Sequence, residues 1–488
     1  MDTTKKIKKS GFWQAIEVAG IAISQLVYLA VMARLLEKSD FGLMAIVGSL
    51  LAFGTVLSEA GMGSALIQRK EMTENHKIAA LHGSLFIGVI FFLIYFFLAN
   101  PIASFFKYEE MELMIRVLAI GIFLNALSSV SISLLHKNFN FKQSSVITVA
   151  SNLISYGAGI GLAFLDFGVW SLVYATLIRA ILKAGGYFYF APIKWKNKIF
   201  KKEFKELFSF GSGIILLRFA NYLGGNGINL LLGKIFAPDI LGVFERAYKI
   251  KGIPSTYLGS VLDKVMFPVM SEIQDEKERL FKVYNTGLGI ANVIMMPVAI
   301  TFILFAEEVV LILLGESWSS AIIPLQIMFV ILPFAISSRM ADSVVRSLGY
   351  VYLNVKRKYT YVLILLVTVG LGGYYYGIVG AAVGYTFSYL MNYILMIVLV
   401  KKILNKTFSE IFIKPLSEAF VMTFIIGFII VAFKLSFNLF NQTNLWLSST
   451  FVLVMISVAG ILFIKYPLIY GNFIQSLRKV ILQKKKHG

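Results

Sequence analysis

VMARLLEKSDFG, residues 31–42, has a counterpart 200 positions later in LLGKIFAPDILG, residues 231–242. In each copy an apolar segment ends in a small residue and a cation, a polar turn follows, and an apolar residue with a glycine opens the next segment. The matching pairs are Ala33-Arg34 and Gly233-Lys234 before the turn, and Phe41-Gly42 and Leu241-Gly242 after it. A repeat of this kind predicts two like halves. In a membrane protein, two like halves are typical of a transporter whose lobes rock about a central site.

The composition predicts a membrane protein. Of the 488 residues, 58% are hydrophobic and 14% aromatic, and the mean hydropathy is +0.78. Crossing a bilayer takes roughly 20 apolar residues, and a search along the chain finds about fourteen such segments. They are residues 11–34, 41–67, 78–106, 113–135, 144–165, 168–191, 207–233, 239–269, 282–305, 320–347, 359–377, 379–400, 412–433 and 445–466. Because a backbone in lipid must satisfy its own hydrogen bonds, and these runs do not alternate, we expect helices throughout.

The fold class expected from these segments is an all-α polytopic membrane protein with about 14 transmembrane helices. We expect two six-helix bundles and two further C-terminal helices. The expected domains are an N-lobe at 1–193, a basic cytoplasmic linker at 194–206, a C-lobe at 207–402, and two helices with a basic tail at 403–488. The basic N-terminus precedes a long segment without a cleavage site, so we expect a retained first helix rather than a signal peptide.

The net charge of +20 is distributed in a way that predicts membrane topology. Loops on one side of the expected helices hold about thirty-one lysines and arginines, whereas loops on the other side hold about four. The positive-inside rule therefore places both termini in the cytoplasm. We expect the basic loops to contact anionic membrane lipids, and we expect no nucleic-acid binding.

Enzyme chemistry finds no support in the sequence. The chain has no cysteine, and its four histidines have no metal-ligand spacing, so we expect no metal site. A phosphate-cradling glycine loop is absent as well. The longest acidic loop, SEIQDEKERL at 271–280, alternates its charges as a solvated helix face does. We therefore expect no catalytic residues and no cofactor.

Ionisable residues inside the expected spans are candidates for function, because each must face a cavity or a partner. In the first lobe they are Glu17, Glu59, Arg116, Arg179 and Lys183, and in the second Arg218, Glu245, Arg246, Lys249, Lys251, Asp263, Lys264, Arg339, Asp342 and Arg346. The surplus of cations favours an anionic substrate. Glu245 with Lys249, and Asp342 with Arg346, are four residues apart and can neutralise each other along a helix. Arg218, Arg246 and Arg339 have less obvious local partners, and the alternative is that each pairs with a carboxylate of a neighbouring helix.

The seventh expected span is unusually polar. Gly224, Gly225 and Gly227 lie close to Asn221, Asn226 and Asn229. These residues make the segment bendable and poorly suited to face lipid, so we expect an internal helix that lines a cavity. Asn221 and Asn229 are candidate substrate contacts for that reason.

Several strings resemble one known family. ARLLEKSDFG at 33–42, EAGMGSALIQRKEMTENH at 59–76, GVWSLV at 168–173 and the stretch at 226–280 resemble bacterial polysaccharide exporters. These are the Wzx-like flippases of O-antigen, colanic acid and teichuronic acid, in the superfamily of multidrug and oligosaccharidyl-lipid exporters. The resemblance runs from about residue 8 to about residue 400.

The resemblance implies a flippase in the bacterial cytoplasmic membrane that moves undecaprenyl-pyrophosphate-linked oligosaccharide by alternating access. It also implies a polysaccharide polymerase and glycosyltransferases as pathway partners, and we expect the chain to work as a monomer. The candidate substrate contacts are Arg218, Arg246 and Arg339, with Arg116 and Arg179 from the opposing lobe and Asn221 and Asn229 beside them.

The family pattern differs from this sequence at one position that bears on coupling. Relatives often carry an acidic residue where Ile228 stands here. Coupling to H⁺ or Na⁺ would then use Glu17, Glu59 or Asp263, and the coupling ion stays open. Two alternative functions also remain: a cation-coupled multidrug exporter, which would need more buried carboxylates, and a non-transporting membrane scaffold for polysaccharide assembly.

Overall fold

The computed structural model describes residues 3–58, 62–69, 71–193, 196, 200–413 and five positions between 420 and 431, and every regular element among them is helical. The bounds are α1 Thr3–Leu35, α2 Lys38–Ser58, α3 Met62–Gln68, α4 Glu74–Phe106, α5 Met111–Lys137, α6 Phe141–Phe164, α7 Val169–Phe190, α8 Lys201–Ile235, α9 Pro238–Glu272, α10 Lys277–Leu304, α11 Ala306–Leu313, η1 Glu316–Ala321, α12 Ile322–Phe329, α13 Leu332–Ser347, α14 Val351–Leu404 and η2 Ser409–Ile413. The order of elements follows the order of the expected spans.

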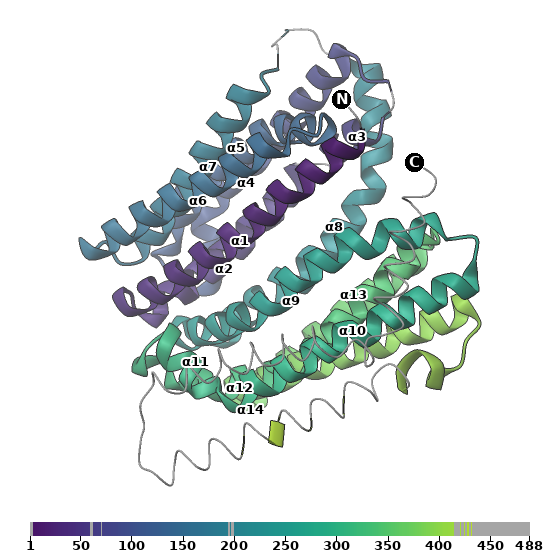
Figure 1. Cartoon of the computed structure of the whole chain (residues 1–488). Coiled ribbons are helices and arrows are strands. Elements are labelled where there is room, and N and C mark those ends of the chain that lie inside the picture. Colours follow the sequence, from purple (N-terminus) through teal and green to yellow (C-terminus); the bar gives the residue numbers. More distant parts are fainter. Residues whose placement is uncertain are drawn as a thin grey trace. The chain divides into compact units, whose positions relative to one another are not determined.

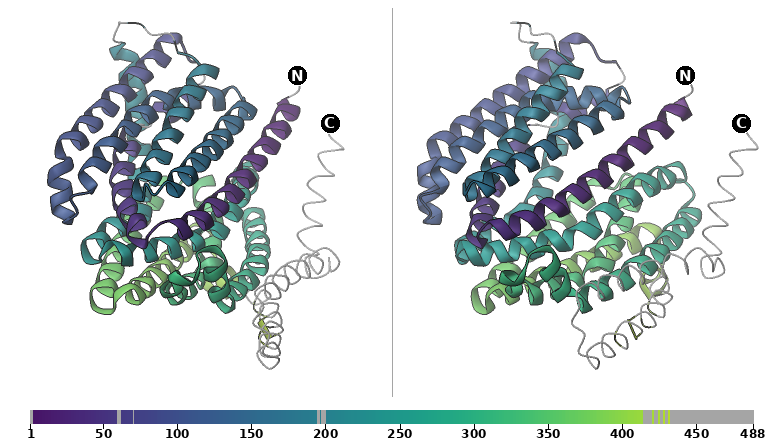
Figure 2. Two further views of the ribbon diagram at one scale, coloured as in Figure 1. Left: turned by 90° about the vertical axis from the view of Figure 1, so that its left-hand side faces the viewer. Right: turned by 60° about the vertical axis from the view of Figure 1, so that its left-hand side comes forward.

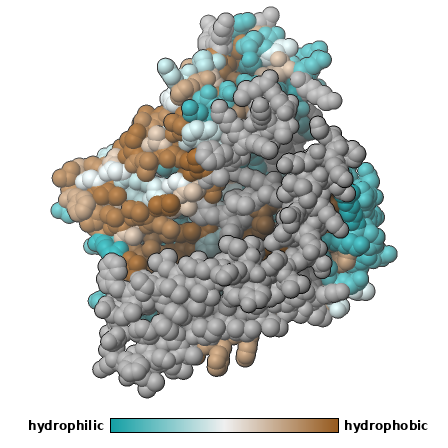
Figure 3. Space-filling view, viewed as in Figure 1, coloured by the Kyte–Doolittle hydropathy of each residue, from teal (hydrophilic) through white to brown (hydrophobic). Residues whose placement is uncertain are grey.

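The helices are long and apolar enough to confirm a multi-pass membrane protein. Seven helices in the described part of the chain can cross a bilayer, or eight if the bent pair Glu316–Phe329 and Leu332–Ser347 is one span. The count of about 14 stays a prediction, because the spans expected at 412–433 and 445–466 lie almost wholly outside the described residues. Figure 3 shows hydrophobic side chains gathered over the bundle of the first helices, with hydrophilic ones at its upper end. Exposed Phe86, Phe97 and Phe164 belong to this apolar surface, as expected for helices in lipid.

The chain forms two compact units. Unit 1 contains Met1–Arg246, Leu313–Ser317 and Val362–Ala381, and unit 2 contains Ala247–Ile312, Trp318–Tyr361 and Ala382–Gly488. Each unit is a set of residues that lie close together. The expected N-lobe and C-lobe, which would move relative to each other, stay a prediction.

Unit 1 is built around a bundle of neighbouring helices (Figures 1 and 2). In it α5 packs against α4 and α7, α6 packs against α7 and α1, and α2 packs against α5 and α8. Figure 2 shows α1 as one unbroken helix. Within the span expected at 41–67, the structure describes α2 up to Ser58 and α3 from Met62.

Unit 2 has its own apolar core, where α10 packs against α12 and α13. Buried side chains from α9, α10, α13 and the last part of α14 converge there, among them Met266, Tyr284, Met340 and Met396. This core holds α13 beside both α9 and α14, which positions the polar residues described below.

α14 contains a break that separates two of the expected spans. Gly377 has a φ of 61°, and the backbone leaves helical geometry at Tyr376 and Gly377. A Cβ built on Gly372 would lie 2.2 Å from the Gly380 carbonyl oxygen, and one built on Gly380 would lie 2.1 Å from that of Gly372. The two halves of α14 therefore approach at backbone distance, as expected where glycines face each other. The expected boundary between 359–377 and 379–400 is confirmed.

The two copies of the sequence repeat meet each other inside unit 1. A Cβ built on Gly42 would lie 1.8 Å from the Pro238 carbonyl oxygen, and one built on Gly242 would lie 2.0 Å from the Lys38 carbonyl oxygen. α2 begins at Lys38 and α9 begins at Pro238, so each glycine faces the first carbonyl of the other copy's helix. The repeat is thus a reciprocal backbone contact, and it explains why glycine stands at the same place in both copies.

Candidate functional site

α13 presents three charged side chains on one face. Arg339, Asp342 and Arg346 are spaced by three and four residues, which aligns them along the helix. The expected pair of Asp342 and Arg346 is confirmed, with 2.8 Å between Oδ2 and Nε. Arg339 packs against α9 at Gly259, where a Cβ would lie 2.5 Å from Nη1. Glycine at this position leaves room for the guanidinium.

The first turns of α14 add a second row to this face. Asn354 Nδ2 donates to Asp342 Oδ1 at 2.7 Å. Arg357 donates to Asn354 Oδ1 through Nε at 3.2 Å and Nη2 at 2.9 Å, and Nη1 donates to Asn392 Oδ1. The Arg357 side chain is only 8% exposed, and its Nη2 lies 3.9 Å from Asp342 Oδ1. Amide side chains therefore orient Arg357 without neutralising it.

These residues form a group that we call the cationic cluster: Arg339, Asp342, Arg346, Arg357 and Lys358. Lys358 interacts electrostatically with all four of the others. The cluster contains four cations and one carboxylate, Asp342, which lies 2.8 Å from Arg346 and 3.9 Å from Arg357. Planar guanidinium groups suit phosphate or carboxylate oxygens, which they can bind in pairs of parallel hydrogen bonds.

Tyrosines lie beside the cationic cluster. Tyr361 and Tyr389, from the two halves of α14, are in edge contact with ring centroids 5.7 Å apart. Tyr389 also contacts Tyr385 at 5.6 Å, and Tyr385 contacts Tyr248 of α9 at 5.4 Å. Tyr389 interacts electrostatically with Arg339 and Arg357, so the aromatic group and the cationic cluster are continuous.

Sequence reasoning missed part of this site. The span expected at 359–377 begins after residues 356–358, but α14 begins at Val351 and contains them. The helix thus starts eight residues before the apolar run that marked the span. The i, i+4 spacing of Arg357 with Tyr361, and of Tyr385 with Tyr389, is the signal that could have found the shared face.

Arg246, expected as a substrate contact, lies in unit 1 with a partner next to it in sequence. Its Nη2 is 2.6 Å from Glu245 Oε2, and its Nε donates to the same oxygen at 2.8 Å. The guanidinium also stacks 4.3 Å from the centre of the Phe41 ring. Arg116 is likewise paired locally, with 2.7 Å between its Nη2 and Glu112 Oε1.

The remaining expected residues of unit 1 are dispersed. Arg179 is half-buried on α7, and Arg218 is half-buried and Asn221 exposed on α8. Asn229 donates to Ser49 Oγ of α2 at 3.1 Å, which is a packing contact between helices. Ser145 Oγ donates to Glu17 at 2.7 Å. Glu59 and the side chain of Asp263 lie outside what the structure describes.

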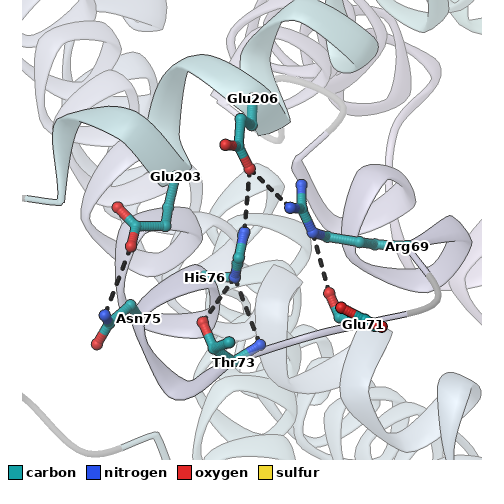
Figure 4. Close-up of polar contacts among 7 residues, drawn as sticks. All are labelled: Arg69, Glu71, Thr73, Asn75, His76, Glu203 and Glu206. Carbon is teal, nitrogen blue, oxygen red and sulfur yellow. Dashed lines mark hydrogen bonds and ion pairs between the residues drawn. The ribbon is translucent and has the colours of Figure 1, made fainter.

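A separate polar group, away from the cationic cluster in sequence, connects the start of α4 to the start of α8 (Figure 4). Glu206 Oε2 lies 2.7 Å from Arg69 Nη2 and 3.3 Å from His76 Nε2. His76 Nδ1 faces Thr73, 3.4 Å from its backbone nitrogen, so we assign the proton to Nε2, which donates to Glu206. These hydrogen bonds, from His76 first and then Arg69, lower the pKa of the Glu206 carboxyl. We call this group the α4–α8 latch.

No described group of three or more acidic or histidine side chains is arranged to hold a metal ion. The chemistry available at the cationic cluster is therefore recognition of negative charge by guanidinium and ammonium groups, with aromatic faces alongside.

Comparisons with known proteins agree with this description. A family model described as "Polysaccharide biosynthesis protein" matches residues 31–323. Teichuronic acid biosynthesis protein TuaB of Bacillus subtilis (strain 168) is 24% identical over 67% of this chain and 68% of its own. Lipopolysaccharide biosynthesis protein WzxC of Escherichia coli (strain K12) is 22% identical over 79% of each chain. The solved structure of lipid II flippase MurJ in an inward closed conformation is similar with a TM-score of 0.73 at 15% identity, covering 94% of this chain and 99% of that one.

The structural likeness shows that the fold is that of a helical membrane transporter. The family match covers more than half of the chain and includes both copies of the repeat, the two glycines that contact each other, and all of α4–α10. The chain belongs to the polysaccharide biosynthesis protein family.

Proposed function

We propose that this protein is a flippase that moves undecaprenyl-pyrophosphate-linked oligosaccharide across the bacterial cytoplasmic membrane by alternating access. The observation that carries the proposal is the cationic cluster, which gathers three arginines and a lysine in one place inside a membrane protein of a polysaccharide family. Guanidinium groups bind phosphate oxygens through pairs of parallel hydrogen bonds, so a pyrophosphate suits this cluster. Charged side chains within a membrane protein are typical of a substrate pathway.

Each part of the cluster has a role in this proposal. Arg339 and Arg357 contact the pyrophosphate oxygens, Arg357 being pre-oriented by Asn354 and Asn392. Lys358 adds long-range attraction as a point charge. Tyr361 and Tyr389 offer apolar faces next to the charge, where the first sugar ring can stack.

The other expected residues keep subordinate roles. Arg218, Arg246, Arg116 and Arg179, with Asn221 and Asn229, are proposed as contacts along the path rather than at the pyrophosphate. Glu17, Glu59 and Asp263 are proposed for H⁺ or Na⁺ coupling. The proposed topology has both termini in the cytoplasm, a position supported by the charge asymmetry of the loops. Polymerase and glycosyltransferases of the pathway are the proposed partners of a monomeric protein.

Multidrug export is less well supported. Cationic drugs need buried carboxylates, and the described residues of unit 2 instead gather cations around Asp342. A scaffold without transport would not need an arginine that amide side chains orient inside a helix bundle.

Reconstituted vesicles test the proposal. Wild-type protein should move fluorescent undecaprenyl-pyrophosphate oligosaccharide between leaflets, and a variant with both Arg339→Gln and Arg357→Gln should not. Arg279→Gln is a matched control, because Arg279 forms an exposed pair with Glu276 outside the cluster. Absence of leaflet transfer by the wild type would support a scaffold, and transfer of a cationic dye in its place would support drug export.

A further inference from the structure

Lys251 of α9 is enclosed by tyrosines in unit 2. The residue is 5% exposed. Its ammonium lies 4.6 Å from the ring centre of Tyr248, 4.5 Å from that of Tyr385 and 5.8 Å from that of Tyr389. It donates one hydrogen bond of 2.5 Å to Tyr385 Oη. Aromatic rings attract a cation through their electron-rich faces, so this arrangement suits a charged amine.

The same ammonium has no carboxylate partner among the described side chains. An ammonium carries three donors, and only the phenol oxygen of Tyr385 accepts from it there. Taking an unpaired charge out of water is strongly unfavourable. Burial of Lys251 therefore opposes its charged form, whereas contact with three aromatic rings favours it. A charge that binds nearby can then determine whether the charged or the neutral form prevails.

We propose that Lys251 is a proton-binding site of the transport cycle. In this proposal the ammonium releases its proton to water, and the neutral amine then accepts a hydrogen bond from the Tyr385 hydroxyl. Both states keep one hydrogen bond between the same two atoms. The inference rests on the proposed function, because it assigns the proton to the site that handles the anionic substrate.

The cationic cluster supplies the link to the substrate. Tyr389 touches Tyr385 and interacts electrostatically with Arg339 and Arg357. The cations of the cluster disfavour an ammonium at Lys251. An anion bound at the cluster offsets part of this repulsion, so it favours proton uptake at Lys251 relative to the unbound state. By linkage, a protonated Lys251 must strengthen anion binding by the same factor.

Other titratable groups lie near Lys251. On α9 they are Tyr248 and Lys249, of which Lys249 is exposed. On α14 they are Tyr385 and Tyr389, and Tyr361 contacts Tyr389. Phenols lose their protons only at high pH, so in assays between about pH 6 and about pH 9 a change of charge among Lys251 and these tyrosines would occur at the amine.

Flipping assays across this pH range test the inference. Lys251→Met removes the charge at similar volume, Lys251→Arg fixes it, and Lys249→Met is the matched control on the same helix. The wild-type and Lys249→Met rates of transfer of fluorescent undecaprenyl-pyrophosphate oligosaccharide should change at least about fivefold with pH, the size of a modest coupling. Both Lys251 variants should lose most of this pH dependence.

The outcomes separate the two proposals. A wild type that transfers no lipid contradicts the flippase function itself. A wild type that transfers lipid, with the same pH profile in the Lys251 variants, contradicts only the proton site, as does a flat wild-type profile. If Lys251→Met does not fold, Tyr385→Phe replaces it: loss of the phenol oxygen should shift the pH midpoint of transfer, and an unchanged midpoint overturns the inference.

A binding measurement provides a readout without transport. Addition of inorganic pyrophosphate to the purified protein in weakly buffered detergent should cause net proton uptake by the wild type and by Lys249→Met. Lys251→Arg should take up less. Equal uptake by all three proteins would place the proton elsewhere.

Discussion

Arg246 of unit 1 and Arg357 of unit 2 are equally hidden, yet their charges are treated differently. Their side chains are 10% and 8% exposed. Arg246 holds a carboxylate at 2.6 Å. Arg357 is held instead by the amide oxygens of Asn354 and Asn392, with Asp342 no closer than 3.9 Å. Arg246 is therefore paired with a carboxylate inside unit 1, whereas the guanidinium of Arg357 is better placed to bind a negatively charged ligand.

The difference shows how a structural buried arginine can be distinguished from one that can bind a ligand. A count of charges along the sequence treats all buried arginines alike. The distinguishing property is the type of acceptor: carboxylates neutralise an arginine, and amides only orient it.

The largest expected effect comes from removing the guanidinium of Arg246. Arg246→Ala removes the ion-pair partner of Glu245, which is 3% exposed, and should lower the free energy of unfolding by about 3–5 kcal/mol. Thermal unfolding in detergent measures this. The double variant Glu245→Gln with Arg246→Met should recover most of the stability. A stable double variant that no longer flips would support Arg246 as a contact along the transport path, and one that flips normally would limit Arg246 to a structural pair.

A somewhat smaller effect, on transport rather than on folding, is expected at Arg357. Arg357→Gln removes charge-assisted hydrogen bonds to the pyrophosphate worth about 1.5–3 kcal/mol, which is roughly 10- to 150-fold in transfer rate. Arg357→Lys keeps the charge and loses the planar fork, and should fall between. Transfer in vesicles, normalised to folded protein, is the measurement. Equal transfer rates for wild type and Arg357→Gln would contradict a role of Arg357 in binding the pyrophosphate.

The reciprocal glycine contact should be sensitive to one added methyl group. Gly42→Ala puts a Cβ onto a backbone carbonyl, which no side-chain rotation relieves, so we expect a loss of about 1–3 kcal/mol or failure to fold. Gly48→Ala on the same helix is the matched control, because nothing lies within 4 Å of its added Cβ. That control should be neutral or slightly stabilising. Similar unfolding temperatures for both variants would mean that the two copies do not depend on this contact.

The smallest effect is expected at the α4–α8 latch, which is partly exposed and screened by water. Because its pKa is lowered, the Glu206 carboxylate stabilises the folded chain above the ordinary glutamate pKa of about 4.3. That contribution is lost as the pH falls through the lowered value. The difference in unfolding temperature between wild type and Glu206→Gln should thus be constant near neutral pH and shrink below about pH 4.3. A difference that grows on acidification would contradict the assignment.

The sequence predicted the fold class and most helix positions because these depend on local composition. Apolar runs as long as a bilayer is thick fold as helices wherever they occur. The boundary within α14 was predicted for the same reason, since Gly377 interrupts the run.

The candidate site was predicted only in part. Arg339 and the pair of Asp342 with Arg346 could be found, because α-helical spacing fixes which residues share a face. Arg357 was not found, because the span expected at 359–377 begins after it. Lys251 was a candidate, but its contact with Tyr385 could not be predicted, since the two residues are 134 positions apart.

By itself the sequence determined that the protein is a helical membrane protein of two like halves, because hydropathy and the repeat at 31–42 and 231–242 are properties of the chain alone. Only the tertiary structure decided that each repeated glycine faces the first carbonyl of the other copy's helix, that Arg246 is paired with Glu245, and that Arg346 and Arg357 share one carboxylate. Charge compensation depends on distance in space, which falls outside any pattern along a single helix.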